Sequence, residues 1–257
     1  MKDASKHMDS IVRRIRKDGC VLMLDFDGTL SPIVSNHRTA QISESTRESL
    51  RNAARHFPVA IISGRALSDV RNKIRLPISY AGSHGLESHI FGTSSKTQVK
   101  IPGEARNAFL HARRALGKIA RDYRGVRVES KRLGYAIHYR SLSSVKARLF
   151  LKEALIAIGT YIRPTGIRVI NDLYTFDIMP DLKRTKAHCA LELFLALRKS
   201  RSSIPVYIGD SSTDEDAFRS LADGITIRVG KNSASVAQFY FQSRSGVDRF
   251  LRKIANI

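Results

Sequence analysis

Reactive side chains stand within three residues of the ends of three short apolar stretches of this chain, residues 21–24, 59–62 and 206–208. They are a pair of aspartates, a serine and a further aspartate: Asp25, Asp27, Ser63 and Asp210. Short apolar runs of this kind are typical of buried parallel strands, and the carboxyl ends of such strands share one edge of a sheet. We therefore expect three acids and a hydroxyl to converge on one small space.

Carboxylates that are held close together repel one another, and a bound cation or the protonation of one group relieves the repulsion. Asp25, Asp210 and Asp214 offer only oxygen ligands, without a nearby Cys or His pair. This donor set suits Mg²⁺ better than zinc. Asp25 could then act as a nucleophile and form an acyl-phosphate, while Asp27 could protonate a leaving alkoxide and later activate water.

Phosphoryl transfer also requires hydrogen-bond donors and a fixed cation. Ser63 supplies a hydroxyl and neighbouring backbone amides. Three basic residues, Lys183, Arg184 and Lys186, precede the apolar helical pattern at 187–198. We choose Lys186 as the cation because it stands directly before that helix.

The elements that must position these residues alternate between strand and helix over most of the chain. The apolar runs named above, with 78–81 and 225–229, read as buried strands, and helix-like segments lie between them. Ser43 and Thr185 are placed to cap two of the helices. This alternation favours an α/β fold with a doubly wound, Rossmann-like parallel sheet.

The middle of the chain reads differently, as helix, two strands, helix and two strands. The strand-like segments 126–130 and 135–139, and then 167–170 and 174–179, form two predicted hairpins. Antiparallel hairpins do not belong in a doubly wound sheet. We therefore assign residues 103–179 to an inserted αββαββ domain, and residues 1–102 and 180–257 to the core.

The composition is typical of a globular protein except for a large positive charge. The 257 residues are 42% hydrophobic and 26% charged, with a formal charge of +21. This charge attracts anions, whether phosphosugar, nucleic acid or lipid headgroup, but it is spread along the chain with few aromatic residues. We expect a cytoplasmic monomer that acts on a small molecule, with neither a membrane nor a nucleic-acid partner. Cys20 and Cys189 are expected to be buried, reduced thiols.

The motifs, taken in order, resemble those of the haloacid dehalogenase superfamily. The sequence DFDGTL at 25–30 resembles motif I, Ser63 motif II, Lys186 motif III, and Gly209-Asp210 with Asp214 motif IV. Within that superfamily, ISGR at 62–65, AGSHGLE at 81–87 and TDEDAF at 213–218 resemble the trehalose-6-phosphate phosphatases. In the inserted segment, VESK at 128–131 and HYR at 138–140 are also similar to that family, which carries a type C2 cap. The resemblance covers about residues 20–250.

The resemblance implies a Mg²⁺-dependent phosphoric monoester hydrolase of trehalose biosynthesis, with a role for each matching residue. Asp25 would be the nucleophile, Asp27 the acid and base, and Ser63 and Lys186 would bind phosphate. The metal would be held by Asp25, the Asp27 carbonyl and Asp210, with Asp214 as an indirect ligand through water or a supporting acid. The substrate-binding residues would be two beside Ser63 and four in the inserted domain: Gly64, Arg65, Glu129, Lys131, His138 and Arg140.

Two positions depart from the family pattern. Ser211 stands where family members usually have a second aspartate, and Ala187 where they have glycine. Neither change removes a reacting group, although the first removes an acid near the metal. Two alternatives stay open at this point: hydrolysis of another sugar phosphate, of the sucrose or mannosylglycerate type, and a basic nucleic-acid-binding protein that has lost catalysis.

Overall fold

The computed structural model describes residues 1–256 apart from residues 35, 95, 132 and 173. The chain divides into two compact units, here called the core unit and the inserted unit. The core unit is Met1–Gln98 with Arg184–Ile257, and the inserted unit is Val99–Lys183. The insertion that we predicted at 103–179 lies within the second unit.

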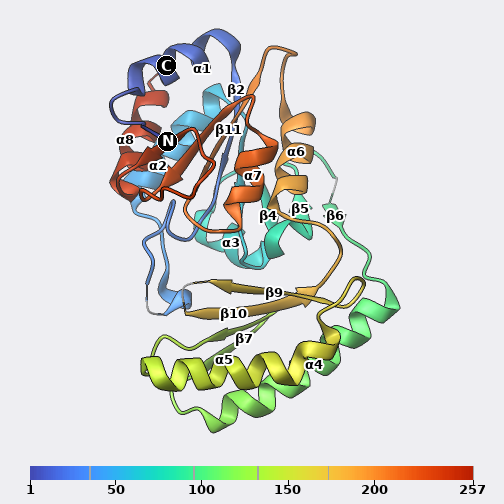
Figure 1. Ribbon diagram of the computed structural model, residues 1–257. Coiled ribbons are helices and arrows are strands. Elements are labelled where there is room, and N and C mark those ends of the chain that lie inside the picture. Colours follow the sequence, from blue (N-terminus) through green and yellow to red (C-terminus); the bar gives the residue numbers. More distant parts are fainter. Residues whose placement is uncertain (35, 95, 132, 173, 257) are drawn as a thin grey trace. The chain divides into compact units, whose positions relative to one another are not determined.

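The core unit is built around a nine-stranded sheet with the order β1-β13-β12-β11-β2-β3-β4-β5-β6 (Figure 1). Its strands are β1 Lys2–Asp3, β2 Cys20–Leu24, β3 Val59–Ile62, β4 Ser79–Gly82, β5 Glu87–His89, β6 Lys96–Gln98, β11 Ile204–Gly209, β12 Ile225–Val229 and β13 Phe239–Phe241. Its α-helices are α1 Met8–Asp18, α2 Glu44–His56, α3 Leu67–Ile74, α6 Lys186–Leu197, α7 Asp214–Ser220 and α8 Arg244–Ile254.

Seven neighbouring strands of this sheet, β1, β13, β12, β11, β2, β3 and β4, pair in parallel, and β2 lies among them with strands on both sides. β3 and then β4 lie on one side of β2, and β11, β12 and β13 lie on the other. Alternate residues of β2 enter two different apolar clusters: Leu22 and Leu24 pack with α1, α2 and α8, whereas Val21 and Met23 pack with α6 and α7. Helices therefore cover both faces of the sheet, and the predicted doubly wound fold is confirmed.

One edge of the sheet differs from the prediction of a purely parallel core. β5 pairs antiparallel with β4, and β6 pairs antiparallel with β5. The sequence at β5, Glu87 to His89, is polar, so it carries neither the apolar run nor the clear alternation by which strands are recognised.

The predicted helix caps are present in the core unit. The Ser43 side chain accepts a hydrogen bond from the Thr46 N–H at the start of α2, 3.1 Å. Thr185 caps α6 by accepting from the Ala187 N–H, 3.2 Å. These caps satisfy backbone N–H groups that have no partner within the helix, and the second fixes the place where Lys186 begins α6.

The inserted unit has the predicted order of helix, two strands, helix and two strands. Its elements are α4 Gly103–Asp122, β7 Arg127–Ser130, β8 Tyr135–His138, α5 Ser144–Ile158, β9 Ile167–Asp172 and β10 Thr175–Pro180. The antiparallel sheet has the order β7-β8-β10-β9, and α4 and α5 lie along one of its faces (Figure 1). On β8 and β10, apolar residues at every second position pack against these helices; Ile137 on β8 and Phe176 on β10 are examples.

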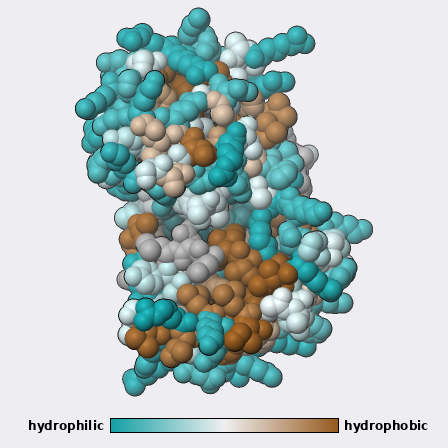
Figure 2. Space-filling view, in the orientation of Figure 1, coloured by the Kyte–Doolittle hydropathy of each residue, from teal (hydrophilic) through white to brown (hydrophobic). Residues whose placement is uncertain are grey.

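Figure 2 shows hydrophobic side chains gathered over α5, where Val145, Leu149, Leu155 and Ile156 are exposed. Both cysteines are free and buried, as expected. Across the residues described, none of the helices has the length and apolar character that crossing a bilayer requires.

Candidate active site

The reactive residues of the core unit lie at the carboxyl ends of β2 and of its two neighbours in the large sheet, β3 and β11. Asp25 directly follows β2, and its N–H donates to the Ile208 carbonyl of β11, 2.9 Å. Asp210 follows β11, and Ser63 follows β3, the strand on the other side of β2. The three strand ends meet at one edge of the sheet, where open parallel sheets form their ligand sites.

In the turn after Asp25 the backbone lies close to the Asp210 carboxylate, and the glycine at position 28 makes this close approach possible. Gly28 has a φ of +79°, a conformation that other residues rarely adopt, and a Cβ there would lie 2.0 Å from Asp210 Oδ2. Any side chain at position 28 would therefore collide with the Asp210 carboxylate.

Three carboxylates form a cluster at this edge. Asp25, Asp210 and Asp214 each offer an oxygen within 4.8 Å of the others. Burial raises the pKa of Asp25 to about 7; Lys186 opposes this shift, and Asp214 adds to it. Burial, followed by the charges of Asp25 and Asp214, also raises the pKa of Asp210 well above its ordinary value. These shifts describe buried carboxylates that lie close together, an arrangement that disfavours the charged form of each.

Lys186 supplies the cation of this cluster. Its Nζ donates to Asp25 Oδ1 at 2.9 Å and to Asp214 Oδ1 at 2.8 Å, and its side chain is 2% exposed. Burial alone would lower the pKa of Lys186, but the two carboxylates raise it above its ordinary value. The ammonium group therefore stays charged and bridges the residue after β2 to the first residue of α7.

Asp214 has further partners besides Lys186. Tyr207 Oη donates to Asp214 Oδ1 at 2.8 Å, and both the N–H and the Oγ of Ser211 donate to Asp214 Oδ2, at 2.9 and 2.7 Å. Against the effect of burial, Lys186 and Ser211 hold the pKa of Asp214 below its ordinary value. Asp214 is thus an ionised carboxylate that is enclosed by donors.

The structure places Arg65, which we expected to bind substrate, against two acids of the core unit. Its Nε and Nη2 donate to the two oxygens of Asp27, each at 2.7 Å, and its Nη1 donates to Asp69 at 2.8 Å. The guanidinium also lies 5.1 Å above the centre of the Phe26 ring. A guanidinium that is held in this way fixes the orientation of the Asp27 carboxylate. Sequence reasoning did not include Asp69; its place four residues after Arg65, near the start of α3, was the available signal.

Ser63 and Gly64 are held by the backbone between β3 and β4. Ser63 is buried, its N–H donates to the Ala81 carbonyl at 3.0 Å, and its Oγ accepts from the Arg65 N–H at 3.1 Å. At Gly64, a Cβ would lie 2.6 Å from the imidazole of His84. The absence of a side chain at position 64 therefore makes room for this histidine.

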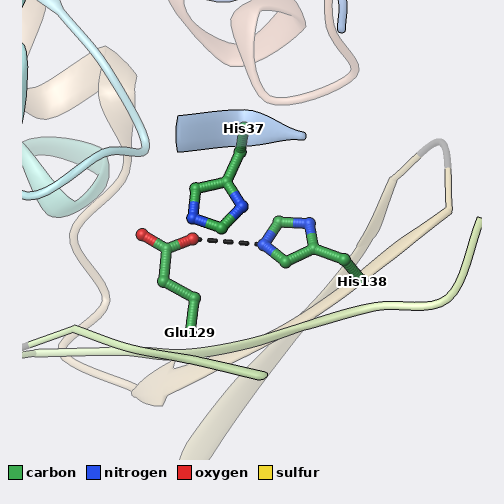
Figure 3. A group of neighbouring side chains, drawn as sticks. All are labelled: His37, Glu129 and His138. Carbon is green, nitrogen blue, oxygen red and sulfur yellow. Dashed lines mark hydrogen bonds and ion pairs between the residues drawn. The ribbon is translucent and has the colours of Figure 1, made fainter. Parts of the chain in front are cut away.

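In the inserted unit, four predicted substrate-binding residues belong to β7, β8 and the segments that follow them. Glu129 Oε2 and His138 Nε2 face one another at 3.1 Å, and both side chains are partly buried (Figure 3). The register places Glu129 opposite Ala136, two residues before His138 on β8. Both side chains therefore share the face of the sheet opposite to the one that packs on α4 and α5.

Lys131 and Arg140 also have partners within the inserted unit. Lys131 Nζ donates to Asp177 Oδ2 at 2.8 Å, and the two side chains are only 9% and 7% exposed. The Arg140 guanidinium lies 4.9 Å above the ring of Tyr174. Sequence reasoning missed Asp177; the available signal was an acid between the apolar residues Phe176 and Ile178 within a predicted strand.

Comparisons with known proteins point to one family. The family model described as trehalose-phosphatase matches residues 23–250. The chain is 34% identical to trehalose 6-phosphate phosphatase RA3 of Zea mays over 92% of its length, and 34% identical to the trehalose-phosphate phosphatase of Mycobacterium leprae over 91%. It spans 70% of the former protein and 57% of the latter.

A solved structure has the same fold. The C-terminal domain of trehalose-6-phosphate phosphatase from C. albicans superposes with a TM-score of 0.85 at 16% identity, covering 97% of both chains. At this level of identity the likeness concerns the fold, and it includes both the core and the inserted units.

Proposed function

This chain belongs to the trehalose-phosphatase family, and from that premise we propose that it is a Mg²⁺-dependent phosphatase that releases phosphate from trehalose 6-phosphate. The observation that carries the proposal is the position of Lys186 Nζ between Asp25 and Asp214. It supplies a buried cation beside a carboxylate nucleophile, which is what transfer of a phosphoryl group to Asp25 needs.

The residues at the sheet edge fit the metal that the family implies. Asp25 and Asp210 with the Asp27 carbonyl would hold Mg²⁺, because these donors are all oxygens. The raised pKa values of Asp25 and Asp210 support this assignment, since burial and the neighbouring carboxylates disfavour their charged forms and a bound cation would offset both effects. When bound, the ion would neutralise phosphate oxygens and orient the phosphoryl group for in-line attack.

In the first step we propose that an oxygen of Asp25 attacks phosphorus, while the bond from phosphorus to the sugar oxygen breaks. Lys186 and the Ser63 hydroxyl would bind the phosphate oxygens. Asp27 would give its proton to the leaving sugar oxygen, which departs as a hydroxyl group. Because Asp27 accepts from Arg65 with both oxygens, the protonated form must give up one of these contacts.

In the second step water attacks the phosphorus of the phospho-aspartate, and the bond from Asp25 to phosphorus breaks. Asp27, now ionised, would accept the proton of that water. Its paired contacts with Arg65 suit this half of the reaction, since an ionised carboxylate accepts two N–H groups at once. Asp25 and the protonated Asp27 are then ready for another cycle.

Recognition of the sugar is proposed for the face of the inserted sheet opposite to α4 and α5. Glu129, Lys131, His138 and Arg140 offer donors and acceptors that can bind sugar hydroxyls, and Gly64 would bind near the phosphate through its backbone. Asp177 would act through Lys131, whose ammonium group it holds. A narrow preference for one disaccharide phosphate would follow from several such contacts, because buried polar groups left unpaired by a wrong sugar are costly.

The proposal is tested by phosphate release from a panel of phosphosugars at saturating Mg²⁺. We expect kcat/KM for trehalose 6-phosphate to exceed that for sucrose 6-phosphate, glucose 6-phosphate and a mannosylglycerate phosphate at least tenfold. Asp25→Asn should abolish release from all of them, because an amide is not a nucleophile towards phosphorus.

The matched control for this substitution is Asp223→Asn, which changes an exposed acid beyond α7 and should keep full activity. Retained turnover in Asp25→Asn would overturn the mechanism. A preference for another ester would overturn the substrate and leave the reaction class in place.

A further inference from the structure

The acceptor positions of Asp214 are all used within the core unit. A carboxylate has about four acceptor positions, two on each oxygen. Lys186 Nζ and Tyr207 Oη occupy those on Oδ1, and the N–H and Oγ of Ser211 occupy those on Oδ2. Asp214 is fully buried. In this arrangement it has no acceptor position left for a metal ion.

The Tyr207 hydroxyl is fixed in its direction by the packing of the ring. Tyr207 is fully buried on β11, and its ring meets that of Phe218 edge to face, with centroids 5.8 Å apart and an angle of 81° between the planes. Burial and the neighbouring carboxylates raise the pKa of Tyr207 well above its ordinary value. The hydroxyl therefore keeps its proton and donates a hydrogen bond to Asp214.

Ser211, which stands where the family pattern has a second aspartate, is a further donor to Asp214. Its hydroxyl donates to Asp214, where a second aspartate would add a like charge. Its carbonyl accepts from Arg228 Nη1 at 3.2 Å, and Arg228 also pairs with Glu215 at 2.7 Å. The loop that carries Ser211 is thereby tied to the adjacent strand β12 and to α7.

We propose that Tyr207 and Ser211 are positioning residues for Lys186, which they hold in place by fixing Asp214 between them. The inference rests on the proposed phosphatase function. Asp214 serves as an anchor for the ammonium group, while Asp25 and Asp210 are left for the metal. Loss of a Tyr207 or Ser211 donor frees Asp214 to rotate, and Lys186 then loses its alignment towards Asp25. Phosphate binding weakens, and the affinity for Mg²⁺ stays nearly the same.

The experiment compares Tyr207→Phe and Ser211→Ala with Tyr80→Phe in the full chain. Tyr80 is the matched control because it is also a buried tyrosine of the large sheet, and its hydroxyl bonds the Leu76 carbonyl at 2.8 Å, away from the acidic cluster. The readouts are steady-state kinetics, the dissociation constants of Mg²⁺ alone and of inorganic phosphate with Mg²⁺ by calorimetry, and the melting temperature.

We expect Tyr207→Phe to weaken phosphate binding about tenfold, the scale of one hydrogen bond to a charged group. Ser211→Ala should weaken it less, because the Ser211 N–H still donates to Asp214. The Mg²⁺ dissociation constant should stay within about twofold of wild type in both variants. Tyr80→Phe should lower the melting temperature and leave both dissociation constants unchanged.

Two results would overturn the inference: phosphate binding by Tyr207→Phe equal to that of wild type, or a loss of Mg²⁺ affinity as large as the loss of phosphate affinity. Failure of the proposed function gives a different result. Wild type would then hydrolyse no phosphosugar, and weaker binding of inorganic phosphate by Tyr207→Phe would still support the positioning role.

Discussion

The charged residues of the core unit and those of the inserted unit are held in different ways. In the core unit one buried ammonium group, that of Lys186, lies between two carboxylates that come from distant parts of the chain. In the inserted unit Glu129 and His138 pair across the neighbouring strands β7 and β8, and their side chains remain 20% exposed. A buried, interlocked network sets one geometry for the reaction, whereas partly exposed groups on a sheet face remain accessible to a ligand. We therefore expect changes in the core unit to lower kcat, and changes in the inserted unit to raise KM.

The largest effect is expected from Lys186→Met, which removes the cation and keeps an unbranched side chain of nearly the same length. It leaves Asp25 and Asp214 to repel one another without compensation, so kcat should fall about 1,000-fold, the upper range for losing one stabilising donor. Steady-state assays at saturating Mg²⁺ measure this loss. A rise in KM of the same size with an unchanged kcat would contradict the expectation that changes in the core unit act on kcat.

A smaller loss is expected from Arg65→Lys, because lysine cannot bind both oxygens of Asp27 at once. We expect kcat/KM for trehalose 6-phosphate to fall about 30-fold, less than the roughly 100-fold or more that complete loss of general acid catalysis costs, because Asp27 itself remains. An aryl phosphate whose leaving group needs no proton should lose less than threefold. Equal losses for the two substrates would mean that Arg65 does not act through Asp27.

The inserted unit is tested by Lys131→Met, with the exposed Lys152→Met on α5 as its control. The first variant removes one partner of a buried ion pair and leaves Asp177 without that partner, so we expect a loss of stability of about 3 kcal/mol in denaturant unfolding. KM should rise about tenfold, the scale of one hydrogen bond to a charged group, with kcat within threefold of wild type. A fall in kcat as large as that in Lys186→Met would show that the inserted unit takes part in the chemistry.

The smallest effect is expected from Glu129→Gln. Its partner His138 is partly exposed, so the pair contributes little to stability, less than about 1 kcal/mol. KM for trehalose 6-phosphate should rise about threefold, and KM for an aryl phosphate, which carries no sugar, should stay the same. A parallel change in both KM values would contradict sugar recognition by Glu129.

Sequence reasoning predicted the parts of the fold and site that depend on local patterns. The apolar runs before Asp25, Ser63 and Asp210 identified the strand ends, and the helical pattern after Lys186 identified the cation. These features depend on residue type and on the short stretch of chain around each residue, both of which the sequence states directly. The αββαββ order of the inserted unit followed from the same kind of pattern.

Contacts between distant residues could not be predicted in the same way. Arg65 meets Asp27, and Lys131 meets Asp177, because of the order of the strands in each sheet and the rotamers of long side chains, which the residue types do not state. Tyr207 looked like one more apolar position within β11. Its hydroxyl acquired a role only when the fold brought Asp214 to it.

In the proposed reaction Asp25 carries the phosphoryl group between its two steps. Rapid acid quenching of the full chain with trehalose 6-phosphate labelled in its phosphate, followed by peptide mapping, tests this most directly. We expect one hydroxylamine-sensitive label per chain during turnover, on the peptide that contains Asp25 and not Asp210, and none in Asp25→Asn. Steady turnover without any label on Asp25, or with a label on another residue, would contradict it.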